Sequence, residues 1–169
     1  PSTITNMDTA FSGNTALSHV TLTNGISKIS SNAFERCTGL TEVEIPASVD
    51  QICPFAFNGC TGLTSVTLEK GIRTININAF KNCTNLSDVK YNGYKTDWDR
   101  VTVNTTGNDT LTNKVQYLCD INFDLNGGTI NGSSTMAKQT VYSNEKLGTA
   151  KCYQNDQTFV VPSDPVREG

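Results

Sequence analysis

The sequence has little charge of either sign, almost no histidine and no long apolar run. Of its 169 residues, 13 are Lys or Arg and 16 are Asp or Glu, so the net charge is −3. Nucleic acids and anionic membranes require a basic protein surface, so we expect neither as a partner. No apolar run reaches the ~20 residues of a membrane-spanning helix, so we expect no membrane insertion. A single histidine, His19, and the lack of any Cys-x-x-Cys pair argue against a zinc site.

The chain also lacks catalytic motifs. His19 has no evident nucleophile as a partner, and no Gly-x-Ser-x-Gly elbow occurs. Glu42 and Glu44 share one strand face like the carboxylates of a glycosidase, but we interpret them as a solvated acidic rim. The alternating Asp and Asn residues of 120–126 are similar to a calcium loop, yet Leu125 stands where an EF-hand needs glycine. We therefore predict no enzyme activity, no metal and no cofactor.

What the first half of the sequence does contain is a repeat of 23 residues. Its columns hold leucine (Leu17, Leu40, Leu63, Leu86), valine (Val20, Val43, Val66, Val89), phenylalanine (Phe11, Phe34, Phe57, Phe80) and cysteine (Cys37, Cys60, Cys83). A fixed period of this size is typical of a solenoid, in which each coil buries its apolar face against the next coil. We predict coils at about 17–39, 40–62 and 63–85.

Each repeat combines a short strand with an inward-facing turn. In the third repeat, Val66 and Leu68 alternate with polar residues, as in a strand with one buried face. Ala79, Phe80 and Cys83 then have the i, i+1, i+4 spacing of one helical turn. We therefore expect a mainly β chain with short helical turns.

Three of the six cysteines belong to the repeat. Cys37, Cys60 and Cys83 would lie roughly 5 Å apart on successive coils, but parallel Cα–Cβ directions are poor for a disulfide. We predict a structural ladder of buried free thiols on the same coils as the aromatic ladder of Phe34, Phe57 and Phe80. Cys119 and Cys152 lie beyond the repeats, and the sequence leaves open whether they pair in an exported protein.

These repeats resemble the BspA-type bacterial leucine-rich repeat. Residues 40–62 have the form LxxVxIPxxVxxIxxxAFxxC, and the pattern recurs in register over roughly residues 10–92. The resemblance implies a curved leucine-rich-repeat solenoid with a parallel sheet along one side. It also implies display on, or secretion from, a bacterial cell. Several proteins of this family bind host proteins or other microbes.

The period breaks after the fourth leucine, and we predict a cap at about 86–118. A solenoid needs a terminal unit to cover its last open core. Thr96 and Asp99 have the spacing of a capping box, which predicts a helix that starts there. Tyr94 and Trp98 would share one face of this helix and are the predicted cap residues. The alternative, in which Trp98 is a binding hot spot, stays open.

The solenoid with its cap is predicted to span 1–118, and a small β-rich module 119–169. Residues 121–125 alternate apolar and polar side chains before two glycines, and 139–142 form a second candidate strand. The segments 123–129 and 164–169 resemble the B-repeat of internalins and related surface proteins, in incomplete form. We expect the chain to be a fragment of a longer, mature protein.

We predict that function lies on the outward face of the strands. The candidate binding residues there are His19, Glu42, Glu44, Ser65, Thr67, Glu69, Asp88 and Lys90. Pro46 falls in the same outward columns. This face has no large aromatic anchor, which favours weak or multivalent binding. An equally simple interpretation is that these side chains only keep the sheet soluble.

The predicted function is adhesion, through binding of an extracellular protein or glycan, by a monomer at the bacterial cell surface or secreted from it. One alternative is a structural stalk that displays another domain. The other is an accessory region of a larger secreted enzyme.

Overall fold

The computed structural model describes residues 10–122, 138–142, 146–147 and 150–151, with side chains described up to Leu118. The chain divides into two compact units, Pro1–Val115 and Gln116–Gly169. The B-repeat-like segments 123–129 and 164–169, the end of the calcium-like run and Cys152 lie outside the described residues. No helix in the described part of the chain is long and apolar enough to cross a membrane.

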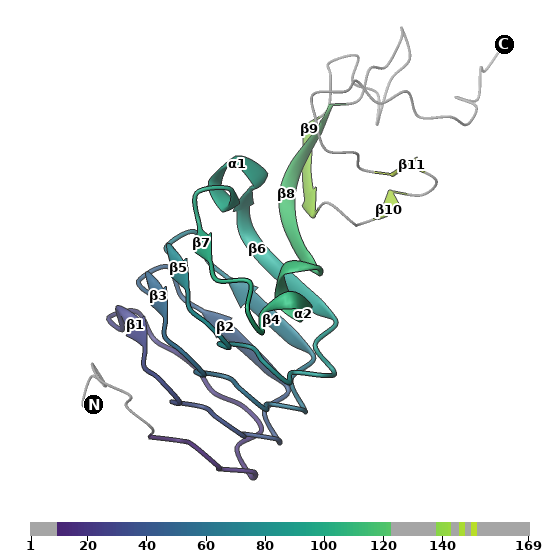
Figure 1. Ribbon diagram of the computed structural model, residues 1–169. Helices are drawn as coiled ribbons and strands as arrows, with labels where there is room; N and C mark the ends of the chain where they lie inside the picture. The colour runs from purple at the N-terminus through teal and green to yellow at the C-terminus, as the bar shows by residue number, and fades with distance from the viewer. Residues whose placement is uncertain (1–9, 123–137, 143–145, 148–149, 152–169) are drawn as a thin grey trace, which may run out of the picture. The chain divides into compact units, whose positions relative to one another are not determined.

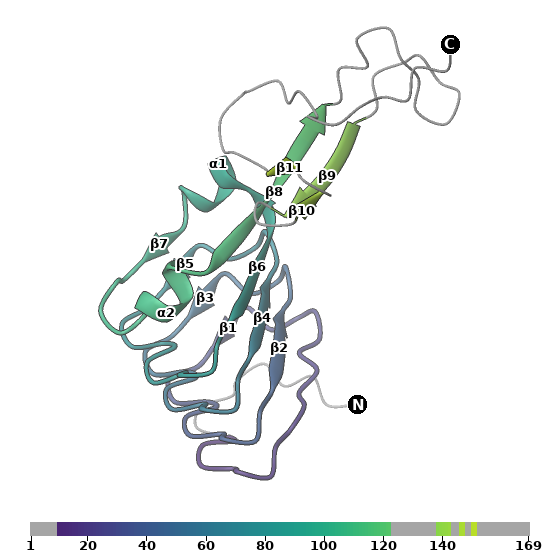
Figure 2. The ribbon, with the colours of Figure 1, turned by 90° about the vertical axis from the view of Figure 1, so that its right-hand side faces the viewer.

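The first unit is a solenoid of stacked coils, in agreement with the predicted fold class (Figure 1). One parallel sheet, called the strand face here, consists of β2 (Glu42–Ile45), β4 (Ser65–Leu68) and β6 (Asp88–Tyr94). A second parallel sheet runs along the opposite side of the coils (Figure 2) and consists of β1 (Lys28–Ile29), β3 (Gln51–Ile52), β5 (Thr74–Ile75) and β7 (Thr102–Val103).

The register of both sheets follows the 23-residue period up to the last coil. On the strand face, Val43 is opposite Val66 and Val66 is opposite Val89, so identical side chains stack inside the solenoid. In the second sheet the pair Ile75 and Val103 is 28 residues apart, so the last coil holds five extra residues. The break in the period is therefore an insertion, after which the coil continues.

The turn that was expected to be helical is a run of hydrogen-bonded turns. Asn32 and Arg36 have φ of 59° and 57°, and Asn78 and Asn82 repeat these left-handed values two coils later. Such residues prevent a helix, because right-handed helices need negative φ throughout. They also turn alternate N–H groups toward the next coil, so that the Phe34 amide donates to the carbonyl oxygen of Ala56 at 2.8 Å.

A column of parallel aromatic rings fills the core beside these turns. The centroids of Phe11, Phe34, Phe57 and Phe80 follow one another at 5.3, 5.2 and 5.1 Å, with interplanar angles of 3°, 4° and 11°. The last three rings are completely buried. A fully buried Phe side chain contributes roughly 1.5–3 kcal/mol through removal of its surface from water. The stack therefore joins neighbouring coils.

The predicted column of buried free thiols is present. The Cys60 thiol donates to the carbonyl oxygen of Phe34 at 3.0 Å, and Cys83 makes the same contact with Phe57 at 3.1 Å. Each cysteine thus bonds the coil before it, which is why a residue that is both small and able to donate recurs there. Burial raises the pKa of Cys60 well above its usual range and that of Cys83 to about 12.

The last coil carries two short helices, α1 (Lys95–Trp98) and α2 (Asp109–Thr112). Helix α1 begins earlier than predicted, because Asp97, rather than Asp99, accepts a hydrogen bond from a backbone amide, that of Tyr94, at 3.2 Å. Asp99 instead pairs with Lys95 at 2.6 Å. Trp98 is buried and contacts the Tyr91 ring edge-on, with centroids 5.2 Å apart. This packing favours the predicted cap role of Trp98 over the alternative of a binding hot spot.

A buried asparagine ends the phenylalanine column. Asn108 lies 28 residues after Phe80, so it occupies the next position of the column in the lengthened coil. Its side-chain oxygen accepts the Phe80 N–H at 2.9 Å, where Phe34 and Phe57 have a carbonyl oxygen of the next coil. Its side-chain amide donates to the carbonyl oxygens of Asn76 and Asn104 at 2.8 and 2.6 Å. Asn108 thus takes the place of the backbone carbonyl that bonds the phenylalanine N–H in the earlier coils.

The second unit contains antiparallel strands in its described part. Strand β8 (Val115–Asn122), which starts at the unit boundary, pairs with β9 (Lys138–Tyr142). A short hairpin pairs β10 (Lys146–Leu147) with β11 (Ala150–Lys151). The strand predicted at 139–142 is confirmed by β9. The strand predicted at 121–125 overlaps only the end of β8.

Candidate functional site

The parallel pairing of the strand face places the predicted binding residues in rows across the coils. Glu42 is opposite Ser65, which is opposite Asp88 on β6. Glu44, Thr67 and Lys90 form the second row in the same way. Outward side chains alternate with buried ones along each strand, as the pleat of a sheet requires. The structure therefore brings six of the eight candidates together on one surface.

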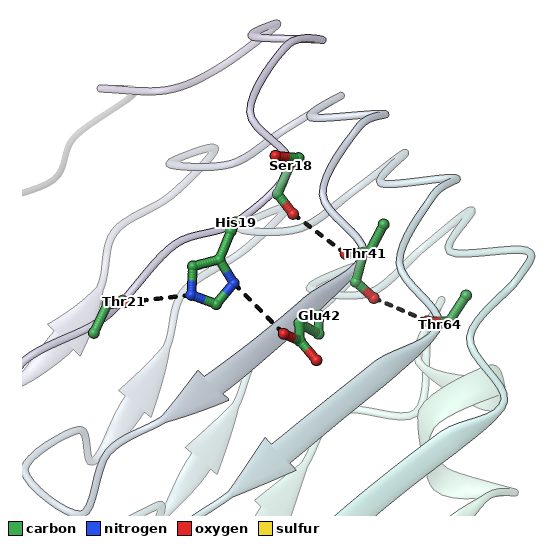
Figure 3. Close-up of polar contacts among 6 residues, drawn as sticks. All are labelled: Ser18, His19, Thr21, Thr41, Glu42 and Thr64. Carbon is green, nitrogen blue, oxygen red and sulfur yellow. Dashed lines mark hydrogen bonds and ion pairs between the residues drawn. The ribbon is translucent and has the colours of Figure 1, made fainter.

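His19 lies at the start of these rows, beside Glu42 of β2, in a part of the chain that does not form the strand expected there. Its Nδ1 is 3.5 Å from Oε1 of Glu42, and its Nε2 is 3.4 Å from the Thr21 hydroxyl (Figure 3). The His19 and Glu42 side chains are each 64% exposed. A contact between two side chains this exposed contributes about 0–1 kcal/mol, so it orients the two side chains more than it stabilises the fold.

These side chains border an open hollow of about 290 Å³ on the strand face. The polar residues that line it are His19, Thr21, Glu42, Glu44, Ser65 and Thr67. The hollow offers two carboxylates, three hydroxyl groups and one imidazole to a ligand. Its groups suit a partner that is rich in hydroxyl groups or carries a cation.

A ladder of hydroxyl groups joins the coils at the residues that precede β2, β4 and β6. The Thr41 hydroxyl donates to the carbonyl oxygen of Ser18 at 3.3 Å, and that of Thr64 to Thr41 at 3.0 Å (Figure 3). Ser87 continues the ladder to the carbonyl oxygen of Thr64 at 3.4 Å. Ser and Thr at this repeat position therefore bond successive coils, a role that the sequence analysis did not assign. Their recurrence at the 23-residue step was the available signal.

The other candidates lie farther along the face and contact neighbouring side chains. The Asn92 amide donates to a carboxylate oxygen of Glu69, and Lys90 is 3.7 Å from Asp88. Pro46 is buried, so its expected outward position is wrong. Strand β2 ends at Ile45, and the Pro46 carbonyl oxygen accepts the Val49 N–H at 2.9 Å, so the proline begins a turn instead of extending the face.

The charged groups of the described residues do not assemble into a metal centre. Within that part of the chain, no group of three or more His, Cys, Asp or Glu residues is placed to hold a metal ion.

Tyr94, the second predicted cap residue, is 36% exposed. The Lys70 ammonium lies 5.5 Å from the centre of its ring. Tyr94 therefore lies at the end of β6, on the edge of the strand face, and Trp98 lies in α1, outside it.

Stacked coils with parallel strands and a repeated Leu-Val-Phe-Cys core define a leucine-rich-repeat solenoid. A family model, the BspA type Leucine rich repeat region in six copies, matches residues 1–102. This match covers more than half of the chain, so the chain belongs to the BspA-type leucine-rich-repeat family. The match ends before the second unit, so the B-repeat resemblance stays a prediction.

A solved structure of a leucine rich cell surface protein from Faecalibacterium prausnitzii A2-165 is similar to this chain. The two are 30% identical over 46% of this chain, with a TM-score of 0.44. The chain spans only 20% of that protein's length. A search of curated proteins finds no match.

Proposed function

We propose that this chain is part of a non-catalytic bacterial surface or secreted protein whose strand face binds an extracellular protein or glycan. The observation that carries the proposal is the hollow around His19, Glu42 and Glu44. Its polar side chains are exposed or half-buried and differ from coil to coil, whereas the inward columns repeat the same residues. The stability of the solenoid explains why the inward columns repeat the same residues. It does not explain why the outward side chains differ from coil to coil.

The chemistry of the hollow points to a partner with hydroxyl groups or cationic side chains. Glu42 and Glu44 are on the same face of β2, and both are exposed. The structure gives Glu44 no ion pair among the described residues. An exposed carboxylate without a partner in the chain can accept hydrogen bonds from a cationic group or a hydroxyl donor of a ligand. Without an aromatic anchor, a single contact is weak, and repeated coils would raise the avidity.

A charge reversal with a matched control tests the proposal. Immobilised extracellular proteins and glycans are screened with the full chain, and each binder is measured again with Glu44→Lys and with Asp50→Lys. Asp50 is also exposed but precedes β3 on the other sheet, so both variants change the charge equally. We expect Glu44→Lys to weaken binding about tenfold or more, because it opposes like charges, and Asp50→Lys to leave it unchanged.

A structural stalk is the second candidate function. Two contacts favour it, the ion pair of Asp88 with Lys90 and the hydrogen bond from Asn92 to Glu69. Both pair outward side chains with each other and so leave fewer of their polar groups for a ligand. Equal binding by both variants, or no binder in the screen, would favour the stalk over the binding surface.

A further inference from the structure

A second hollow, of about 300 Å³, lies within the first unit beside helix α1. It is called the cap hollow here, and its charged and phenolic residues are Lys70, Arg73, Tyr91, Asp97 and Arg100. Three cations face one carboxylate, in a chain whose overall charge is −3. The cap hollow is therefore a local concentration of positive charge, and it shares no residue with the hollow on the strand face.

The single carboxylate of the cap hollow, that of Asp97, already has partners within the chain. Asp97 lies 3.0 Å from the Lys70 ammonium and accepts a hydrogen bond from the Tyr94 amide. The bond from Lys70 holds the pKa of Asp97 below its usual range. Neither Arg73 nor Arg100 forms an ion pair with a carboxylate of the described residues. The two guanidinium groups thus remain available to an external anion.

Tyr91 supplies a neutral donor in the same place. Its repeat position holds Ile45 and Leu68 in the preceding coils, so a hydroxyl group is introduced only at this coil of the sheet. Tyr91 is 1% exposed, and Trp98 and the close backbone of Gly93 fix its ring. Tyr91 lines the cap hollow, so its phenolic O–H is a donor that a ligand bound there can use.

We propose that the cap hollow binds a small oxyanion, such as a carboxylate, sulfate or phosphate group, between the guanidinium groups of Arg73 and Arg100, with the Tyr91 hydroxyl as a hydrogen-bond donor. Arg side chains bind such groups through paired N–H donors. Asp97 limits the affinity, because it repels the ligand and holds the Lys70 ammonium. This site is additional to the proposed strand face and does not depend on it.

The test titrates the isotope-labelled full chain separately with sodium sulfate, sodium phosphate and sodium acetate. NMR spectra recorded at constant ionic strength monitor each titration. We expect saturable shifts of the amide signals of residues 70–73 and 100–101. The anion with the lowest Kd identifies the preferred oxyanion. Shifts that stay linear in concentration, or that spread evenly over the exposed lysines, would show ionic-strength effects only and overturn the proposal.

Four variants separate a built site from general attraction. Arg73→Gln with Arg100→Gln should raise the Kd about tenfold or more, and Tyr91→Phe about threefold, because charge-assisted bonds are the stronger ones. Asp97→Asn should lower the Kd. Lys28→Gln with Lys81→Gln removes the same charge from exposed positions elsewhere and should change nothing. A weaker or unchanged affinity of Asp97→Asn, or an equal loss in the lysine control, would refute the site.

Discussion

Replacing Asn108 by alanine removes the side chain that ends the phenylalanine column. Asn108 is completely buried, and its amide makes hydrogen bonds with Phe80, Asn76 and Asn104 at 2.6 to 2.9 Å. Alanine keeps the backbone of the cap and deletes all of these bonds. The substitution therefore isolates the contribution of this side chain to the end of the solenoid.

The expected loss follows from the partners that remain unpaired. The Phe80 N–H is buried and loses its acceptor, which costs about 1–3 kcal/mol. The two donated bonds contribute about 0.5–1.5 kcal/mol each. The loss at Asn76 lies at the low end, because its carbonyl oxygen also accepts the Ala79 N–H at 3.3 Å. Asn108→Ala should therefore lower the free energy of unfolding by about 3 kcal/mol.

Urea unfolding measures this loss, and the fluorescence of Trp98, the single tryptophan of the chain, reports on the cap directly. The matched control is Asn113→Ala, because Asn113 is an exposed asparagine at the end of α2. A surface change of this kind costs less than about 0.5 kcal/mol. A loss below about 1 kcal/mol for Asn108→Ala, or equal losses in both variants, would refute the role of Asn108 as the end of the column.

Three further predictions concern the repeat core and its turns. Phe57→Ala should cost about 3–5 kcal/mol in urea unfolding, because it leaves a cavity between stacked rings; a loss under about 2 kcal/mol would argue against close packing. Cys60 and Cys83 should resist iodoacetamide in the native chain at about pH 8, since burial raises both thiol pKa values; rapid labelling would contradict their burial. Arg36→Gly should stabilise the chain by up to about 1 kcal/mol, because Arg36 has φ of 57°; lower stability would show that its side chain contributes more than its backbone costs.

The period predicted the interior of the solenoid well because packing repeats with the coil. Residues that touch their own equivalents, such as Phe34 and Phe57, must keep the same shape in every coil, so the sequence shows them directly. The strand register follows from the same step. The outward rows of the candidate site could be predicted for this reason too, since a side chain between two buried ones faces outward.

Other features depend on contacts that the period does not contain. The second sheet rests on strands of two residues, too short for an alternating pattern. The turns required φ values that Asn and Gly accept easily, but Phe55 and Arg36 occupy such positions as well, so residue type alone was not decisive. Asn108 was missed because five inserted residues hide its place in the phenylalanine column. Pro46 was misplaced because its turn depends on where β2 ends.

The most direct test of the strand face as a binding surface is carboxyl footprinting with a partner from the screen. The chain is labelled with a carbodiimide and an amine, with and without the partner, and each carboxylate is quantified by mass spectrometry. We expect the partner to protect Glu42 and Glu44, which are exposed on the strand face, and to leave Asp50 unchanged. Protection of Asp50 with continued labelling of Glu42 and Glu44 would contradict the account.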